Sequence, residues 1–250
     1  MRMLVRHHDP HWDDVNRLAD DRFPLNPSGS RHVAISSHVR DELRRFRGID
    51  ARVSHNTLDM DSLTSGDGVG WRRRLGISAD DIVLLHPATP YPRKEVAAAA
   101  RFADEVAANW DGRVVYWLTG GSRDPMDGCG RYAFLSGRCH SAGDMYAAAD
   151  AVLLTSSWEG WGNPVVEGAA LDLPVVTGRW PALTEIRRLG VRDIPVSAPG
   201  AAARLLSEIG SGPGHRIEGL LAALSGSRLA SELEELLSEA GSSSPGRTLR

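Results

Sequence analysis

Residues 151–171 read AVLLTSSWEGWGNPVVEGAAL, and this stretch decides the fold. An apolar run opens it, a glycine-containing loop follows, and a helical pattern closes it. The run predicts a buried β-strand, because near-continuous Val, Leu and Ala suit a sheet that is covered on both faces. Asn163 is a good helix N-cap, and Pro164 suits the first helical position. The stretch therefore predicts a strand–loop–helix unit.

The same alternation runs along the chain in both directions from this unit. Apolar strand candidates are residues 3–6, 32–36, 51–55, 82–87, 114–119, 132–135, 151–155, 173–177 and 194–196. Helical patterns lie at residues 39–46, 94–110, 144–149, 164–171, 182–189 and 201–209. Strands that alternate with helices in this way predict an α/β fold with doubly wound sheets.

A polar stretch divides the chain into unequal parts. Residues 57–80 carry Asp, Ser, Gly and Thr around the sequence SGDGVG, which is typical of a linker. We expect residues 1–66 to form a partial N-terminal domain with its hinge. Residues 67–225 have the length and the strand–helix steps of a complete domain. Residues 226–250 are expected to form a C-terminal helix and a disordered tail.

The N-terminal part is short for a doubly wound domain. We expect it to lack about two or three opening strand–helix units, which an in-frame extension upstream of Met1 would supply. An incomplete sheet leaves an open edge. Residues 1–60 are therefore expected to be loosely held, or to pair with another chain in an oligomer.

Composition excludes several classes of function. Lys and Arg number 29 against 32 Asp and Glu, so the net charge is −3 and no basic field favours nucleic acid. No apolar run reaches the ~20 residues that a bilayer span needs, and the first residues lack the apolar stretch of a signal peptide. We expect a cytoplasmic protein without a transmembrane segment, in which Cys129 and Cys139 are reduced thiols.

The loop of the opening stretch has the features of an anion site. Gly160 and Gly162 let the backbone approach a ligand closely, and amides at a helix start attract negative charge. Glu159 in the loop and Glu167 in the predicted first helical turn would flank that site. Carboxylates accept hydrogen bonds from hydroxyls, so the pattern describes a phosphate between two hydroxyl-bearing groups, as in a nucleotide sugar. The alternative is a capped helix with both carboxylates solvated.

A second cluster follows the strand candidate at residues 82–87. Residues 86–95 read HPATPYPRKE and place Arg93 and Lys94 at a helix start, where the helix dipole disfavours cations. A nearby anion would remove that conflict, and both side chains are common diphosphate ligands. The alternative is a solvated basic turn.

The stretch EGWGNPVVE resembles the Glu-x7-Glu motif of the retaining glycosyltransferases of family 4, which have the GT-B fold. Trp161 stands here for Phe, and Gly168 for Ala. The resemblance implies that Glu159 contacts the donor sugar and Glu167 the nucleotide ribose. It places the donor diphosphate on the backbone of Gly162, Asn163 and Pro164.

Other segments resemble the same family. Lys94 matches the Lys of its G-R-x-x-x-x-K-G loop, whereas the Arg of that loop falls at Thr89, so Arg93 would substitute for it from another direction. Gly120 and Gly121 resemble a second loop, V-G-x-G, beside the nucleotide. Residues 132–138, which end in Arg138, resemble the segment whose backbone reads the base.

Two further segments extend the resemblance on both sides of the Glu-x7-Glu stretch. Residues 144–150 resemble the L-Y-x-x-A-D element that leads to it. Residues 174–185 resemble P-V-V-x-T-x-x-G-G-x-P-E, with bulkier residues around Arg179 and Trp180 in place of Gly-Gly. We expect Glu185 to be a first-turn helix acid with a capping role.

The N-terminal part offers one candidate residue. The sequence RHHD at residues 6–9 ends a strand candidate, and His11 is near. Neighbouring histidines on a strand point to opposite faces, which opposes shared metal ligation, so no metal is expected. In the family a His at such a strand end lies near the sugar, which makes His8 or Asp9 the corresponding group.

These features predict a retaining glycosyltransferase that moves a hexose from a nucleoside diphosphate sugar to an unknown acceptor. Lys94 and Arg93 would stabilise the departing diphosphate without a metal or other cofactor, and Glu159 would orient the sugar. Two alternatives remain open. One is a non-catalytic nucleotide-sugar binding protein, and the other is a sugar-nucleotide epimerase of similar fold.

Overall fold

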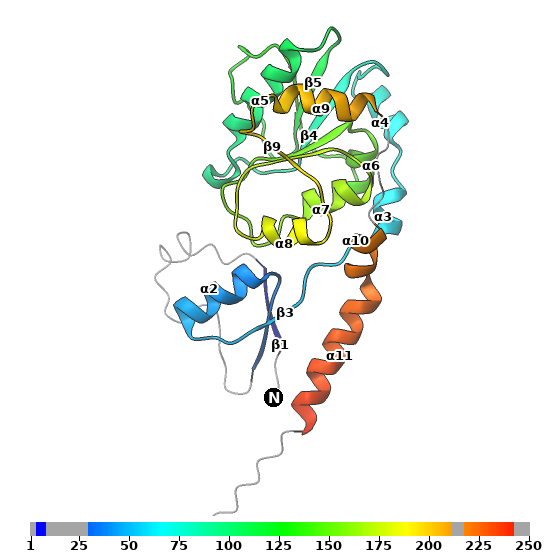
Figure 1. Cartoon of the computed structure of the whole chain (residues 1–250). Helices are drawn as coiled ribbons and strands as arrows, with labels where there is room; N and C mark the ends of the chain where they lie inside the picture. The colour runs from blue at the N-terminus through cyan, green and yellow to red at the C-terminus, as the bar shows by residue number, and fades with distance from the viewer. Residues whose placement is uncertain (1–3, 9–29, 212–217, 243–250) are drawn as a thin grey trace, which may run out of the picture.

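The computed structural model describes residues 4–8, 30–211 and 218–242, which form two parallel β-sheets with helices around them (Figure 1). The larger sheet has the strand order β6-β5-β4-β7-β8-β9. Its strands are β4 (Ile82–His86), β5 (Val114–Leu118), β6 (Ala133–Ser136), β7 (Ala151–Leu154), β8 (Val175–Thr177) and β9 (Ile194–Pro195). All neighbouring pairs are parallel, which confirms the predicted α/β architecture.

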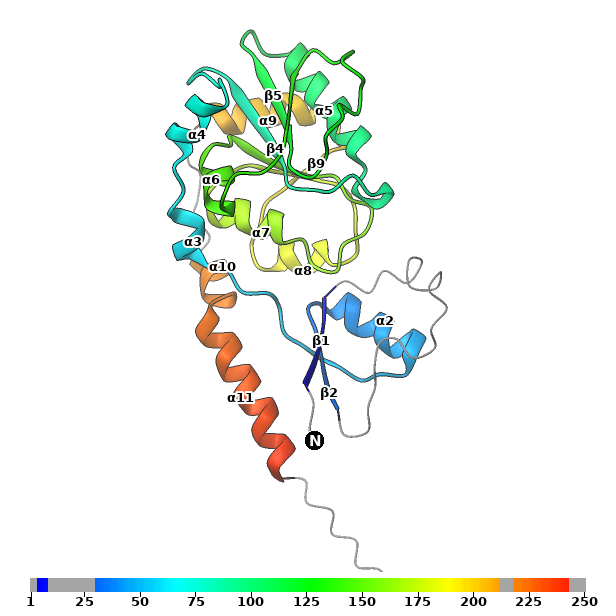
Figure 2. The same cartoon turned by 180° about the vertical axis from the view of Figure 1, so that it is seen from behind.

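Helices cover both faces of the larger sheet. Helices α5 (Val96–Ala108) and α9 (Ala201–Gly210) share one apolar core with it. Helices α6 (Ala142–Ala147), α7 (Asn163–Ala170) and α8 (Leu183–Arg188) share the other. Figure 2 shows the same arrangement from behind.

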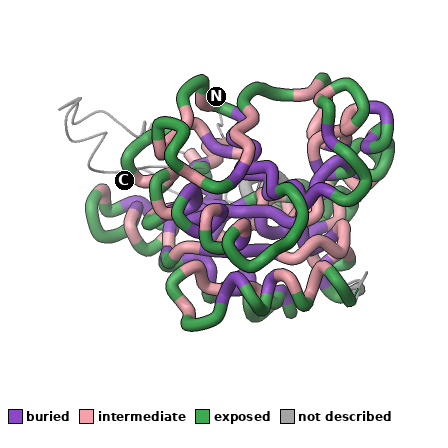
Figure 3. Tube along the Cα trace, turned by 90° about the horizontal axis from the view of Figure 1, so that it is seen from above, coloured by how far each residue is buried: buried purple, intermediate pink, exposed green. Residues whose placement is uncertain are grey.

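The strands read as apolar runs because both of their faces are buried. In β4, Ile82 and Leu84 enter the core beneath α5 and α9, whereas Val83 and Leu85 enter the opposite core. All four are at most 4% exposed. Successive side chains of a strand point to opposite faces, so a sheet covered on both sides needs apolar residues at every position. Seen from above, the buried segments run through the middle of the molecule (Figure 3).

The smaller sheet lies in the N-terminal part. It has the order β1-β2-β3, with β1 (Leu4–His7), β2 (Arg31–Ala34) and β3 (Arg52–Val53) all parallel. Helix α2 (Ser37–Arg47) connects the last two strands. Within the described residues β1 and β3 are the edges of this sheet. The expected pairing of an open edge with another chain stays a prediction.

Helix α2 has clear start and stop signals. The side chain of Ser36 accepts a hydrogen bond from the Val39 amide, as an N-cap does. Gly48 ends the helix with φ of 62°, a left-handed conformation that favours glycine. Val39 and Leu43 are fully buried in the same core as α7, so one continuous core joins the two sheets.

The polar stretch of residues 57–80, where the sequence places the domain boundary, is partly helical. It contains α3 (Met60–Thr64) and α4 (Gly68–Arg74), both packed near α6. The side chains of Asp59 and Asp67 each accept a hydrogen bond from an amide three residues further on, at 3.1 and 2.8 Å. The aspartates that suggested a linker are therefore N-caps.

The chain returns to the N-terminal part at its C-terminal end. Helix α10 (Glu218–Ala223) precedes α11 (Gly226–Ser242), which lies in the segment where the sequence places a C-terminal helix, and residues 243–250 lie outside the described residues. Helix α11 runs beside the smaller sheet (Figures 1 and 2). The hydroxyl of Ser54, which follows β3, donates to a Glu232 carboxylate oxygen at 2.5 Å.

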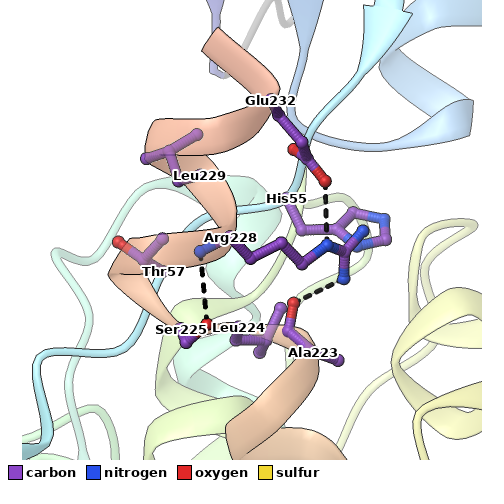
Figure 4. Close-up of a pocket in the computed structure, with 8 residues that line it drawn as sticks. All are labelled: His55, Thr57, Ala223, Leu224, Ser225, Arg228, Leu229 and Glu232. Carbon is purple, nitrogen blue, oxygen red and sulfur yellow. Dashed lines mark hydrogen bonds and ion pairs between the residues drawn. The ribbon is translucent and has the colours of Figure 1, made fainter. Parts of the chain in front are cut away.

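A small hollow lies between α11 and the segment that follows β3. Figure 4 shows Arg228 beside His55, with its guanidinium donating to Glu232 at 2.8 Å and to the Ala223 carbonyl at 2.5 Å. Leu224 also lines the hollow. Intramolecular contacts thus already engage the polar groups of Arg228 and Glu232.

The structure also bears on the cysteines and on membrane-spanning helices. Cys129 and Cys139 are both free, as predicted. Across residues 4–8, 30–211 and 218–242, no helix combines the length and the apolar character that crossing a bilayer requires.

A buried histidine pair joins β1 to β2. His7 Nε2 lies 3.0 Å from His32 Nδ1. The two residues are 6% and 7% exposed, respectively. Burial, with smaller contributions from His32 and His8, lowers the pKa of His7 to about 4, and burial lowers the pKa of His32. Both rings are therefore neutral in the folded protein near neutral pH.

This pair predicts acid sensitivity of the smaller sheet. The pKa of His7 is about 4 in the fold against an ordinary value of 6.5, so the unfolded chain binds more protons between these limits. Stability should therefore fall as pH drops through this interval, by up to about 3 kcal/mol. Amide exchange of β1 and β2 against pH measures it. His7→Gln should flatten the dependence, and an unchanged slope in that variant would contradict the assignment.

Candidate functional site

The candidate site lies where the strand order of the larger sheet reverses direction. β4 and β7 are neighbours in the sheet although β5, β6, α5, α6 and the short 3₁₀ helix η1 (Pro92–Lys94) separate them in sequence. In open parallel sheets, ligands bind outside the carboxyl ends of the strands at such a switch point. The basic turn of residues 87–95 follows β4, and the glycine-containing loop of residues 155–162 follows β7. The fold thus brings together the two segments that the sequence singled out.

Glu159 is the centre of this arrangement. Its carboxylate accepts hydrogen bonds from Lys94 Nζ at 2.5 Å, Arg93 Nη1 at 3.4 Å and Ser156 Oγ at 2.5 Å. Glu159 is only 7% exposed. The sequence predicted that an anion would relieve the conflict between these cations and the dipole of the next helix. The structure supplies that anion from within the protein.

Backbone contacts hold the basic turn against the loop. Thr155 Oγ1 donates to the carbonyls of Lys94 and Glu95 at 3.0 and 3.1 Å, and the Ser157 amide donates to the Arg93 carbonyl at 2.8 Å. Glu95 has φ of 49°, a left-handed conformation that is uncommon for a residue other than glycine. These bonds fix the direction from which Lys94 reaches Glu159.

Glu167 occupies a different environment from Glu159. It lies in the second turn of α7, because the helix begins at Asn163, and this corrects its predicted first-turn position. Its Oε2 accepts a hydrogen bond of 2.5 Å from the hydroxyl of Tyr146, a buried residue on α6. Burial raises the pKa of Glu167, although the Tyr146 hydrogen bond acts in the opposite direction.

The start of α7 also differs from the prediction. Gly162, with φ of 114°, takes the N-cap position, so Asn163 is the first helical residue and Pro164 follows in the first turn. The side chain of Asn163 accepts a hydrogen bond of 2.8 Å from Asn56 Nδ2 instead of capping the helix. Only glycine adopts this φ without strain, so Gly162 takes the N-cap position that the sequence analysis assigns to Asn163.

The paired glycines after β5 lie beside the turn that follows β4. A Cβ atom at Gly120 would lie 2.6 Å from the Ala88 carbonyl oxygen, and one at Gly121 would lie 2.5 Å from Leu118 Cδ2. The small size of Gly120 therefore permits packing between two loops, and that of Gly121 leaves room for the Leu118 side chain. Arg138, which follows β6, is exposed, and none of these three residues contacts the Glu159 cluster through a hydrogen bond that the structure shows.

The carboxyl end of the smaller sheet faces the same loop. A Cβ atom at Gly160 would lie 2.1 Å from the backbone carbonyl oxygen of His8 and 3.2 Å from Ile35 Cδ1. His8, which follows β1, is exposed, whereas His7 is buried. Gly160 thus allows the N-terminal part to approach. Asp9 and His11 lie outside the described residues.

Sequence reasoning missed a third contact between the two parts. The ring of His55 stacks on that of Trp161, with centroids 4.2 Å apart and planes at 15°. His55 Nε2 also lies 3.3 Å from Glu185 Oε2. Glu185 is in the first turn of α8, as predicted, but α8 has no side-chain cap bond. The aromatic residue of the EGWG segment was the available signal, since an aromatic side chain in a loop needs a packing partner.

Glu185 caps a helix of the other part. Its two carboxylate oxygens each lie 3.0 Å from the Ser37 amide, and one lies 3.4 Å from the His38 amide. Burial acts to raise the pKa of Glu185, but the hydrogen bonds from His55, Ser37 and His38 outweigh it and lower the pKa to about 2. The carboxylate is therefore ionised across the physiological range.

A family profile described as "Glycosyl transferases group 1" matches residues 82–211, more than half of the chain. A curated relative, the mannosylglucosylglycerate synthase of Thermotoga maritima, is 27% identical over 213 residues, which cover 69% of this chain and 50% of the relative. The chain thus spans about half the length of that relative.

Solved structures share the fold. Sucrose-phosphate synthase from Thermosynechococcus elongatus has a TM-score of 0.68 and 17% identity, covering 96% of this chain and 68% of the other. HepE from Anabaena in complex with UDP and glucose has a TM-score of 0.69 and 20% identity, covering 94% and 71%. At such identities the likeness shows the fold alone, and it confirms the predicted GT-B architecture. The narrower assignment to family 4 stays a prediction.

The Glu159 cluster predicts a measurable coupling. Lys94→Met leaves a buried carboxylate one cation short, so it should cost about 3 kcal/mol of folding free energy. Combined with Glu159→Gln, the loss should be smaller than the sum of the single losses by about 1.5–3 kcal/mol. Chemical denaturation of the four proteins measures this coupling. Strictly additive losses would mean that the 2.5 Å contact contributes nothing.

Proposed function

The chain belongs to group 1 of the glycosyl transferases, and on that premise we propose that it binds a nucleoside diphosphate sugar and transfers its hexose with retention of configuration. One observation carries the proposal. Lys94 and Arg93, both suited to a diphosphate, converge on the Glu159 carboxylate at the switch point of the larger sheet. In the ligand-free protein the buried Glu159 carboxylate pairs with the two cations that would otherwise bind an anionic ligand.

Substrate binding would exchange one anion for another. The donor diphosphate would take over Lys94 and Arg93, and the Glu159 carboxylate released from them would accept hydrogen bonds from sugar hydroxyls. As the bond between sugar and diphosphate breaks, negative charge grows on the leaving group. The same two cations would stabilise that charge, so no metal is required for this step. The start of α7, at Gly162, Asn163 and Pro164, would add its dipole.

Other residues would surround the nucleotide. Glu167 would accept hydrogen bonds from the ribose hydroxyls, since its second oxygen can still accept while Tyr146 holds the first. Gly120, Gly121 and Arg138 follow β5 and β6, on the side where the nucleotide would extend. His8 would approach the sugar from the N-terminal part, because its backbone touches Gly160. The acceptor is unassigned.

Relatives support a hexose donor, since one solved neighbour is described in complex with UDP-glucose. Two alternatives are distinguished by products. A non-catalytic binding protein would leave UDP-glucose and GDP-mannose intact with any acceptor, and an epimerase would return an epimerised sugar nucleotide. Transferase activity would release the nucleoside diphosphate, by transfer to an added sugar acceptor or by slow hydrolysis. Chromatography of the nucleotide products separates the three outcomes.

Calorimetry with UDP and GDP tests the role of Lys94. At least one of them should bind the full chain, and Lys94→Ala should weaken it by about 1.5–3 kcal/mol, as for a charge-assisted hydrogen bond. Arg113→Ala is the matched control, because Arg113 immediately precedes β5 at the opposite end of the sheet. Equal affinity in the wild type and Lys94→Ala would remove Lys94 from the site.

The two glutamates should separate in their effects. Glu167→Gln should weaken UDP or GDP itself, because this residue is assigned to the ribose. Glu159→Gln should not weaken that affinity, because it removes the carboxylate that competes with the diphosphate for Lys94 and Arg93. It should reduce turnover of the sugar nucleotide by at least about tenfold, because a neutral amide orients hydroxyls less well. Binding and initial-rate measurements on both variants check this. The opposite pattern would exchange the two roles.

A further inference from the structure

We propose that Glu185 is a positioning residue that couples the N-terminal sheet to residues 159–163, which end the glycine-containing loop and begin α7. The inference rests on the proposed function only in that this loop is the donor loop; the coupling itself is a property of the ligand-free protein. Glu185 is on α8, beyond the loop in sequence, and its partners are on α2 and after β3. It therefore bridges the two sheets at one carboxylate.

The first half of the bridge is electrostatic. Helix α2 has no acidic residue in its first turn, and its own N-cap, Ser36, satisfies only the Val39 amide. The amides of Ser37 and His38 point at Glu185 instead. A carboxylate at a helix N-terminus is stabilised by the helix dipole and by hydrogen bonds to unsatisfied amides. Glu185 thus supplies the anion that α2 lacks.

The second half of the bridge runs through His55. Its Nε2 is 3.3 Å from Glu185 Oε2, and its ring lies flat on Trp161. Trp161 is 2% exposed, and its backbone carbonyl accepts a hydrogen bond of 3.1 Å from Trp180 Nε1. One face of the Trp161 indole therefore packs against His55, and the Trp161 backbone is held by Trp180. Movement of His55 would be transmitted to Trp161, which stands two residues after Glu159.

Nearby contacts explain why the effect concentrates on this loop. Gly160 touches the His8 carbonyl, and Asn163 is bonded to Asn56. Together with the Trp161 stacking, positions 160, 161 and 163 thus contact residues that follow β1 and β3. Glu185 adds a charged group to these contacts between the two parts, and its side chain is 13% exposed. Its removal should loosen the loop without unfolding the larger sheet.

Amide hydrogen exchange of the ligand-free full chain tests the coupling. In Glu185→Ala, peptides covering residues 157–166 should exchange about tenfold faster than in the wild type, while peptides of β4 and β5 should stay within about twofold. His55→Ala should give the same pattern. The double variant should add little, because both changes break one bridge. Glu185→Gln keeps an acceptor for the amides, so it should restore part of the protection.

Asp193→Asn is the matched control. Asp193 is a carboxylate with a 4% exposed side chain, and its partners Arg187 and Thr177 both belong to the larger part. This variant should leave residues 157–166 protected. If Asp193→Asn loosens that segment as much as Glu185→Ala does, or if Glu185→Ala leaves it at the wild-type rate, the coupling is overturned.

The same samples separate this inference from the proposed function. Titration with UDP and UDP-glucose follows the exchange measurement. Faster exchange at residues 157–166 in Glu185→Ala supports the coupling whether or not either compound binds. Failure of the wild type to bind UDP, GDP or their sugar nucleotides would overturn the proposed function and leave the coupling in place.

Discussion

The candidate site depends on one interaction, the buried contact between the Glu159 carboxylate and the cations Lys94 and Arg93. Ion pairs of this kind recover the cost of leaving water only when their geometry is good and other hydrogen bonds complete it. Ser156 supplies such a bond to Glu159, and Thr155 and Ser157 hold the backbone of the basic turn. The contact therefore fixes the loops after β4 and β7 against each other at the switch point.

Much of the fold was predictable from the sequence. The strands of the larger sheet stood out because residues such as Val83 and Leu84 are buried on opposite faces, which makes each strand a continuous apolar run. The start of α7 was predicted one residue too late, at Pro164 instead of Asn163. The positive φ of Gly162 places the N-cap there, and that φ is set by the surroundings of the residue, which the sequence does not show. The helices at residues 60–64 and 68–74 were missed because their aspartate caps resemble turn residues.

The site was predictable in part, and for a physical reason. Motif spacing located Glu159, Lys94 and Arg93 because each lies just after a strand of one parallel sheet, where strand ends meet. The partner of Glu185 was not visible, since Ser37 is 148 residues away in the sequence and the contact arises only when the two sheets pack together. His55 was missed for the same reason. Contacts within one sheet follow from local patterns, whereas contacts between sheets depend on packing.

We propose that a diphosphate takes the place of Glu159 as the partner of Lys94. The most direct measurement is the ¹³C resonance of the Glu159 side-chain carboxylate, assigned by its loss in Glu159→Gln, during titration with UDP and GDP. The resonance should shift as one of them saturates the protein, towards its position in ligand-free Lys94→Met. Saturation without any movement of this resonance, or no binding of either nucleotide, would contradict it.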